Sequence, residues 1–381
     1  MKKHCLIIIA FALFFFVVPV LAQGDPAGAD NAQIPESFEA EVLEVLDQKE
    51  FVREDGARVI QQNLRLKALN GPQMGQEFAS EGISEIEVAN AGIYKKGDRV
   101  LVQHSLAEDG LEKFYVADFV RRGYLYLLAG IFSLLILVIG RNKGLRSLIS
   151  LIASFFVIIR FILPQILAGA NPLAVGLVGA LLILALMIYF TEGWNRKSHL
   201  AVLSVLVSLG ITLTFSWLFV ALARLSGLAQ EESVFLIGLG RQAIDFRGLL
   251  LAGMLIGAIG VLDDVIVSQL EAVRQIKDAD PRMSRKQVFQ AAFKIGNTHL
   301  GTMVNTLFLT YAGASLPLLL LFTANQGVFV DFSQALNNEA IATEVVRTLA
   351  GSIGVALSMP IATALGAYFL PKGEYGDDLI C

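Results

Sequence analysis

Two adjacent carboxylates, Asp263 and Asp264, interrupt a glycine-rich apolar run, "GAIGVLDDVIVSQL", at residues 257–270. Carboxylates within a membrane segment are costly, so they usually face the interior of a helix bundle or a water-filled cavity. At low dielectric constant both groups should not stay charged without compensation. The pair would then hold a proton and titrate as a unit, or bind a cation together with nearby oxygen ligands.

A second polar pattern lies in the next apolar segment, "GNTHLGTMVNTLFLTYAG", at residues 296–313. Its polar side chains recur at helical spacing: His299, Thr302, Asn305, Thr306 and Thr310. Antiparallel pairing of the two segments would bring Thr302 and Asn305 to the depth of the aspartates. The predicted ion, proton or solute cluster is Asp263, Asp264, Thr302, Asn305 and His299. Two alternatives are a satisfied polar network that only locks the helices, and a carboxylate pair bathed by cytosolic water.

The glycines before the carboxylates share one helix face with Asp264. Gly253, Gly257, Gly260 and Asp264 follow one another at spacings of four, three and four residues. The GxxxG pattern of Gly253 and Gly257 is typical of helices that approach each other closely in a membrane. It predicts that a neighbouring helix packs on these glycines and that Asp264 faces the bundle interior.

A further charge, Arg160, lies in the apolar stretch "VIIRFILPQ". Counted along its helix, it is nearer the outer boundary of the membrane than the aspartates are. Direct pairing with them would have to close a vertical offset of roughly 12 Å. We therefore expect the Arg160 side chain to reach outward to the headgroups.

The composition indicates a polytopic α-helical membrane protein. Of the 381 residues, 55% are hydrophobic and only 17% are charged, against about 25% charged residues in soluble domains. Seven segments are predicted to span the membrane: 124–140, 146–167, 173–190, 200–223, 248–270, 300–322 and 345–370. The net charge of −4 gives no indication of nucleic-acid binding.

The residues before the membrane domain divide into three parts. Residues 1–22 are predicted to be a signal peptide, with an uncleaved anchor helix as the alternative. Residues 23–35 are predicted to be a linker. Residues 36–120 alternate in polarity over about five short stretches, which predicts a small β-barrel-like domain of OB or SH3 type. The two cysteines, Cys5 and Cys381, lie at opposite ends and provide neither a disulfide framework nor a metal site.

The positions of basic residues predict the orientation. They concentrate around the loops 141–145, 191–199 and 271–299, whereas the alternate loops carry few. The N-terminal domain is therefore expected outside the plasma membrane, and the tail at 373–381, after the membrane domain 121–372, in the cytoplasm. Within the last basic loop, residues 284–296 predict an amphipathic surface helix. Its apolar face would be Val288, Ala291, Ala292 and Ile295.

Four stretches in order resemble the YibE/F family of bacterial multi-spanning membrane proteins. They are "NPLAVGLVGALLILALMIYFTEGWNRKS", "IDFRGLLLAGMLIGAIGVLDDV", "GNTHLGTMVNTLFLTYAGASLPLLLL" and "LAGSIGVALSMPIAT". The resemblance covers about 124–370 and implies the architecture and the membrane location, but no substrate. It also implies that Asp264 occupies an acidic position of the fifth span, while Asp263 sits where some members have an apolar residue.

No catalytic signature of the GxSxG, HExxH or P-loop type occurs, so we expect no enzyme activity, no cofactor and no bound metal. The leading hypothesis is transport or sensing of a small solute or ion through the cluster between the fifth and sixth spans. The alternative is a membrane scaffold or signalling protein that docks a partner through its extracytoplasmic domain. The expected partners are the lipid bilayer and either an extracytoplasmic protein or further copies of the chain in a homo-oligomer.

Overall fold

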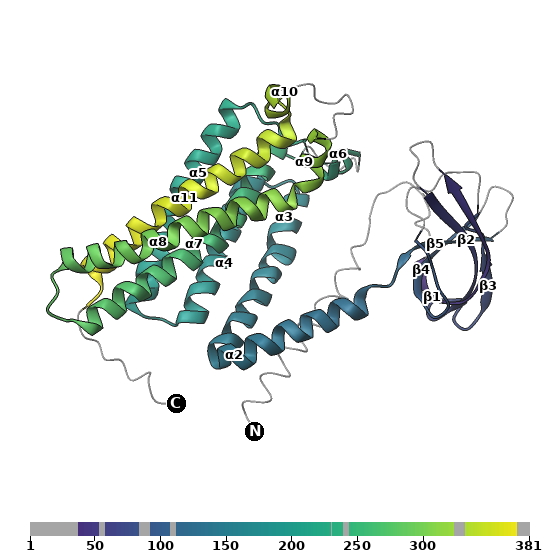
Figure 1. Ribbon diagram of the computed structural model, residues 1–381, viewed down its shortest axis with the longest axis horizontal. Coiled ribbons are helices and arrows are strands. Elements are labelled where there is room, and N and C mark those ends of the chain that lie inside the picture. Colours follow the sequence, from purple (N-terminus) through teal and green to yellow (C-terminus); the bar gives the residue numbers. More distant parts are fainter. Residues whose placement is uncertain are drawn as a thin grey trace. The chain divides into compact units, whose positions relative to one another are not determined.

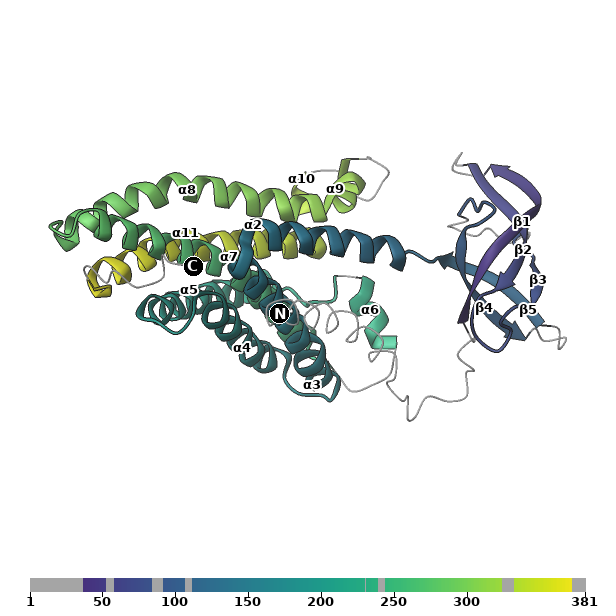
Figure 2. The same ribbon diagram turned by 90° about the horizontal axis from the view of Figure 1, so that it is seen from below.

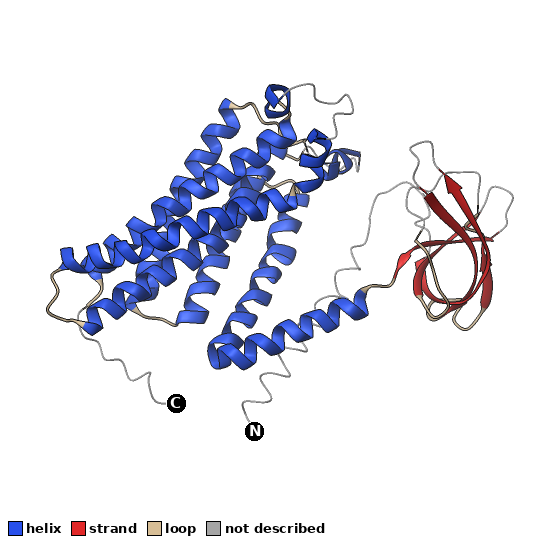
Figure 3. Ribbon diagram, in the orientation of Figure 1, coloured by secondary structure: helices blue, strands red, loops and turns tan. Residues whose placement is uncertain are grey.

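The structure of the protein is a computed structural model that describes residues 37–52, 58–83, 92–106, 112–229, 231–238, 244–323 and 332–371. The predicted signal peptide, linker and cytoplasmic tail lie outside the described residues. Within these ranges the strands belong to the N-terminal part of the chain and the helices to the remainder (Figure 3). The chain separates into two compact units, divided between Val138 and Ile139.

The N-terminal unit contains one antiparallel sheet in the order β3-β2-β1-β4-β5. Its strands are β1 (Ser37–Val52), β2 (Arg58–Ala68), β3 (Glu77–Ser80), β4 (Arg99–Leu106) and β5 (Glu112–Phe119). Alternate residues of the three central strands point to one face, where Phe38, Val42, Leu64, Leu66 and Val100 form an apolar core. The predicted β-rich domain is confirmed, while its closure into a barrel stays a prediction. Residues 84–90, within the region expected to be β-rich, lie outside the described residues.

The second part of the chain is helical. Its elements are α2 (Arg122–Val157), η2 (Ile158–Ile162), α3 (Leu163–Leu167), α4 (Pro172–Glu192), α5 (Arg196–Leu222), α6 (Glu231–Gly238), α7 (Phe246–Ala279), α8 (Arg285–Ala314), α9 (Leu316–Thr323), α10 (Phe332–Leu336) and α11 (Glu339–Phe369). Side-chain caps explain several starts: Asn171, Asn195 and Asp245 each accept a hydrogen bond from a backbone N–H of the first turn. Ser284 and Gln287 form a capping box before α8.

Five helical runs in the described part of the chain are long and apolar enough to cross a membrane: Arg122–Leu167, Pro172–Glu192, Arg196–Leu222, Phe246–Ala279 and Glu339–Phe369. The predicted spans 124–140 and 146–167 fall within the first run, interrupted at Arg141, where φ is 48°. The predicted span 300–322 is divided between α8 and α9. The protein is therefore a multi-helix membrane protein, and the number seven stays a prediction.

The predicted surface helix at 284–296 is the first part of α8, which continues without a break into the sixth segment. Its packed side differs from the expected face. Val288, Ala292 and Gly296 are buried, whereas Ile295 is 53% exposed. The observed spacing of four residues follows the line of contact with the neighbouring helices rather than the distribution of apolar side chains.

Helix α7 is the centre of the helical unit and contacts α4, α5, α8 and α11 (Figures 1 and 2). Its buried residues form one broad face that includes Leu255, Ile259, Leu262, Ile266 and Leu270. Burial of this face on several helices at once fixes how α7 is rotated about its own axis.

The amide of Gln269 ties α7 to two of these helices. Its Nε2 donates to the carbonyl oxygen of Ala292 on α8 at 2.9 Å and to the hydroxyl of Thr363 on α11 at 2.8 Å. Gly296 makes room for this amide, since a Cβ atom there would lie 2.6 Å from Oε1 of Gln269. Away from water, these hydrogen bonds replace hydration that the buried amide has lost.

Close helix contacts occur at glycines other than the predicted ones. A Cβ atom on Gly366 of α11 would lie 2.9 Å from Leu270, and one on Gly176 of α4 would lie 2.6 Å from Cβ of Ala252 on α7. A Cβ atom on Gly354 of α11 would collide with the hydroxyl of Thr212 on α5. These three glycines let α11 and α4 approach their neighbours as small residues do in membrane bundles.

The predicted packing ridge on α7 is not observed among the described residues. No atom lies within 4 Å of the position that a Cβ would take on Gly253 or Gly260, and Gly257 meets only the hydroxyl of Tyr311, at 3.4 Å. The spacing of the glycines was compatible with a close helix contact, but α7 buries its opposite face instead. The ridge therefore leaves space rather than admitting a helix.

Substitution by alanine should distinguish the glycines at close helix contacts from those of the α7 ridge by its effect on stability. Gly354→Ala should lower the free energy of unfolding by about 1–3 kcal/mol, because the new methyl group overpacks Thr212. Gly260→Ala meets open space and should leave stability unchanged or raise it by up to about 1 kcal/mol through helix propensity. Thermal or denaturant unfolding in one detergent measures both. Equal losses of stability would contradict the assignment of Gly354 as the packing contact.

Candidate functional site

An exposed stripe runs along α7 on the side opposite its buried face. Its members are Gly253, Gly257, Gly260, Asp264 and Ser268, each three or four residues from the last. All five are exposed within the helical unit. Asp264 therefore does not enter the packed interior, in contrast to the sequence-based expectation, because the apolar neighbours Leu262, Val265 and Ile266 occupy it.

Three hollows lie along this stripe. Gly253 lines a cavity of about 230 Å³, here called the Arg347 cavity. Gly257 lines a small, partly enclosed space of about 10 Å³, the Tyr311 chamber, close to the size that one water needs. Ser268 lines an open groove of about 570 Å³, the His299 groove. One helix face thus meets three successive spaces from the start of α7 towards its end.

Other helices supply polar side chains to these spaces. The His299 groove is formed with Thr298, His299 and Thr302 of α8. Two buried hydroxyl residues of α5, Thr212 and Ser216, line the Tyr311 chamber together with Tyr311 of α8 and Arg347 of α11. Arg347 also lines the Arg347 cavity and so lies between the two spaces.

The register of α7 and α8 agrees with the predicted antiparallel pairing. Gly257 lies beside Tyr311, and Gln269 lies beside Ala292 and Gly296. Between these contacts, Asp264 falls near the level of Thr302. The structure brings Ser268, His299 and Thr302 together in the His299 groove, whereas Asp264 does not line that groove. Asn305 is exposed on the next turn of α8.

The cluster is open rather than internally satisfied. Within the described residues, no hydrogen bond joins Asp264 to Thr302 or Asn305. The α8 hydroxyls bond their own helix: Thr306 donates to the carbonyl of Thr302 at 2.9 Å, and Thr310 to that of Thr306 at 2.7 Å. An oxygen-rich surface that leaves its carboxylate unpaired can accept a proton, a cation or a polar solute.

Asp263 does not share the environment of Asp264. Successive residues of a helix point about 100° apart, so the two carboxylates point in different directions, and Asp263 is less exposed than Asp264. One oxygen of Asp263, Oδ1, is buried and has no hydrogen-bond partner. The adjacent carboxylates therefore diverge, which does not support the hypothesis of one cation held by both.

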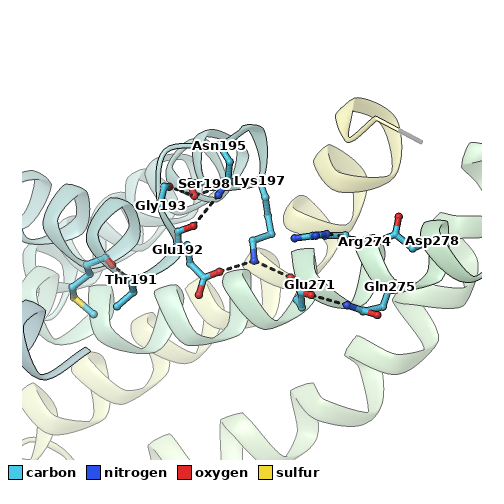
Figure 4. Close-up of polar contacts among 11 residues, drawn as sticks. Thr191, Glu192, Gly193, Asn195, Lys197, Ser198, Glu271, Arg274, Gln275 and Asp278 are labelled. Atoms are coloured by element: carbon cyan, nitrogen blue, oxygen red, sulfur yellow. Dashed lines mark hydrogen bonds and ion pairs between the residues drawn. The ribbon is translucent and has the colours of Figure 1, made fainter. Parts of the chain in front are cut away.

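A partly buried ion triad at the junction of α4, α5 and α7 was not predicted. The Lys197 ammonium, in a residue only 8% exposed, contacts Glu192 at 2.6 Å and Glu271 at 2.8 Å (Figure 4). Glu271 also accepts a hydrogen bond from Gln275 at 2.8 Å. Glu192 and Lys197 lie around the loop 191–199, which is expected to face the cytosol. Glu271 lies far from them in the sequence, so the local pattern gave no reason to expect the three side chains together. The triad carries one net negative charge, and its Glu271 lies on α7, the helix that holds Asp263 and Asp264.

Two further expectations can be compared with the structure. Arg160 lies in the π-helical turn η2 and is exposed, and no ion pair joins it to the aspartates among the residues described. The same residues contain no group of three or more histidine, cysteine or carboxylate side chains that could hold a metal ion.

Removal of the shared cation should destabilise the bundle. Lys197→Met leaves two carboxylates facing each other without compensation and should lower the free energy of unfolding by about 3 kcal/mol. Arg274→Met is the matched control, since Arg274 pairs with Asp278 at the surface at 3.7 Å and should cost less than about 1 kcal/mol. Unfolding in detergent compares the two. If Lys197→Met lowers the free energy of unfolding no more than Arg274→Met does, the triad does not stabilise the bundle.

Comparison with known proteins supports the architecture described above. A family model described as YibE/F-like protein matches residues 128–372. No curated protein and no solved structure matches the chain. The matched region covers well over half of the chain and contains the stripe on α7, the polar face of α8 and the Lys197 triad. The chain therefore belongs to the YibE/F-like protein family.

Proposed function

We propose that this protein moves or senses a small solute or ion across the bacterial plasma membrane, along the stripe of α7. The observation that carries the proposal is that a single helix face lines the Arg347 cavity, the Tyr311 chamber and the His299 groove in succession. From Gly253 to Ser268 the helix rises about 22 Å, most of a hydrocarbon core of about 30 Å. The spaces therefore extend over a distance that a translocation path requires.

The glycines favour a path because they withhold side chains from it. At Gly253 and Gly260 no described atom comes within 4 Å of a Cβ position, so the volume beside the backbone stays unfilled. The polar groups around it come from α5, α8 and α11. A lipid-facing surface would favour apolar side chains here, since uncompensated polar groups are costly in hydrocarbon.

Passage requires a movement. Leu307 of α8 is 7% exposed and lines the Tyr311 chamber together with Val261, on the side towards the His299 groove. These apolar side chains separate the chamber from the groove. A displacement of α8 relative to α7 would open the path at this level, in the manner of shear between packed helices.

Asp264 is the acidic group of the stripe. It is exposed on α7 between Gly257, which lines the chamber, and Ser268, which lines the groove, and there it can exchange a proton or hold a passing cation. Asp263 and the Lys197 triad act on the same helix from its other side, as fixed charges that help set the potential at Asp264.

We place the β-sheet domain outside the cell and the C-terminus in the cytoplasm, on the distribution of basic residues alone. In this orientation the Arg347 cavity opens towards the outside and the His299 groove towards the cytoplasm. The alternative function, a scaffold that docks a protein through the outer domain, predicts that deletion of 36–120 removes a co-purifying partner while the membrane domain stays folded.

Cysteine accessibility tests whether water lines the stripe. In a Cys5→Ser, Cys381→Ser background, Gly260→Cys and Ser268→Cys should react with a water-soluble maleimide, because thiols ionise only in contact with water. Leu203→Cys is the control: Leu203 is 46% exposed on α5 and should face lipid, where its thiol would stay unreactive. If both stripe cysteines label no faster than Leu203→Cys, the water-lined path is excluded.

The role of Asp264 is tested by flux. Asp264→Asn should reduce ion- or proton-coupled movement of solutes into proteoliposomes at least about tenfold, since removal of a titrating carrier group abolishes its coupling step. Asp278→Asn changes a half-buried carboxylate near the end of the same helix, away from the stripe, and should leave flux unchanged. Measurement over a panel of solutes and pH values compares the variants. Equal coupled flux through Asp264→Asn and the unmodified protein would exclude Asp264 as the carrier group.

A further inference from the structure

Two residues that line the Arg347 cavity carry polar atoms that the chain leaves unpaired. Nε of Arg347 and Oγ1 of Thr343 are both buried, and neither has a hydrogen-bond partner. The two residues are four apart on α11, so they lie on one helix face, and both line the cavity. Thr343 is only 3% exposed. Buried polar atoms are nearly always satisfied in folded proteins, so two orphans beside one cavity call for an acceptor that the chain does not supply.

The guanidinium of Arg347 is only partly paired within the described residues. One nitrogen, Nη1, lies 3.3 Å from Oε1 of Glu344, a long, single contact. A guanidinium offers five donors in a planar fork that matches a carboxylate along an edge. The pairing with Glu344 leaves the Nε edge of the fork for a second acceptor.

The remaining walls are mostly apolar, with Ser233 of α6 as the other polar side chain. Phe246, Leu249 and Leu250 from the start of α7 line the cavity with Arg347 and Thr343. At about 230 Å³ the cavity far exceeds the roughly 30 Å³ that one water occupies in the liquid. A cationic fork, an unpaired hydroxyl and an apolar wall together fit a small molecule with an acidic head and a hydrocarbon part.

Contacts outside the cavity hold its rim in place. Oε1 of Glu339, at the start of α11, accepts hydrogen bonds from the backbone N–H groups of Ser226 and Gly227 at 2.5 and 3.1 Å. Arg247 donates to the carbonyl of Leu225 at 3.2 Å. The loop that contributes Gly227 to the cavity is therefore tied to both α11 and α7, so the cavity is a preformed feature of the bundle.

We propose that the Arg347 cavity binds a small organic carboxylate, with its head on Arg347 and Thr343 and its hydrocarbon part against Phe246, Leu249 and Leu250. This assignment rests on the proposed function and deepens it, since it names the class of solute that enters the path. Inorganic phosphate is less suited, because it has four polar oxygens, and those not bound by Arg347 and Thr343 would meet mostly apolar walls that cannot hydrate them.

Thermal unfolding of the purified full chain tests the assignment. Sodium acetate, butyrate, succinate and benzoate are titrated at constant ionic strength, with sodium chloride and the neutral analogue butyramide as controls. At least one carboxylate should raise Tm with saturation, as a ligand of the folded state does, while chloride and butyramide should not. If no carboxylate produces a saturable increase, or if butyramide produces the same one, the cavity holds only water or an apolar guest and the proposal is overturned.

Three variants locate the binding. Thr343→Val keeps the shape of the side chain and should weaken the apparent affinity about five- to tenfold through loss of one hydrogen bond. Arg347→Gln should abolish saturation, and Arg160→Gln, which removes an arginine outside the cavity, should not change it. If Arg347→Gln fails to fold, the comparison of Thr343→Val with Arg160→Gln still shows whether the carboxylate binds in the Arg347 cavity. A saturable increase that Thr343→Val leaves unchanged would overturn the site.

The test of carboxylate binding is independent of the test of the path, because binding is measured by thermal unfolding and not by flux. Carboxylate binding with an unreactive Gly260→Cys would keep the site and reject the water-lined path. A reactive Gly260→Cys without carboxylate binding would keep the path and reject this class of solute.

Discussion

The one-sided burial of α7 is the constraint on which the rest of the helical unit depends. An amide in a membrane bundle must find its hydrogen bonds inside the protein, and Gln269 finds them on α8 and α11. These bonds, with the apolar face from Leu255 to Leu270, leave α7 one rotational setting. That setting turns the glycines and Asp264 away from the packed core. It also fixes the register of α8, so that Thr302 comes to the level of Asp264.

Ionised groups near the ends of the helices reinforce the arrangement. Lys197 joins α4, α5 and α7 through two carboxylates. Lys277, only 3% exposed, donates to the carbonyls of Gly366 and Leu370 and so caps the C-terminal end of α11. A cation at this end of a helix is stabilised by the unpaired carbonyls and by the helix dipole. The packed side of α7 is thus held along its length, while its open side keeps the three hollows and their polar groups.

Much of the architecture could be predicted from local pattern. Composition and apolar runs indicated a multi-helix membrane domain after a β-rich domain, and the structure contains both. The rise per residue also placed Asp264 and Thr302 at similar depth, which the α7–α8 contacts support. The prediction was weaker where helices join: α8 merges the expected surface helix with the sixth segment, and its packed side excludes Ile295. Continuity depends on cap and loop geometry, and the contact line depends on the neighbours rather than on polarity alone.

The sequence by itself determined that Gly253, Gly257, Gly260, Asp264 and Ser268 share a helix face, because the period of a helix is a property of its own backbone. It could not determine what that face meets. A glycine ridge serves equally to admit a helix or to leave a space, and only the competition among α4, α5, α8 and α11 for the surface of α7 decides which. The same holds for Lys197 and Glu271, which are far apart in the chain, and for the orphan groups of Arg347 and Thr343. Whether a polar atom finds a hydrogen-bond partner depends on all the groups that pack around it, and these are determined by the tertiary structure.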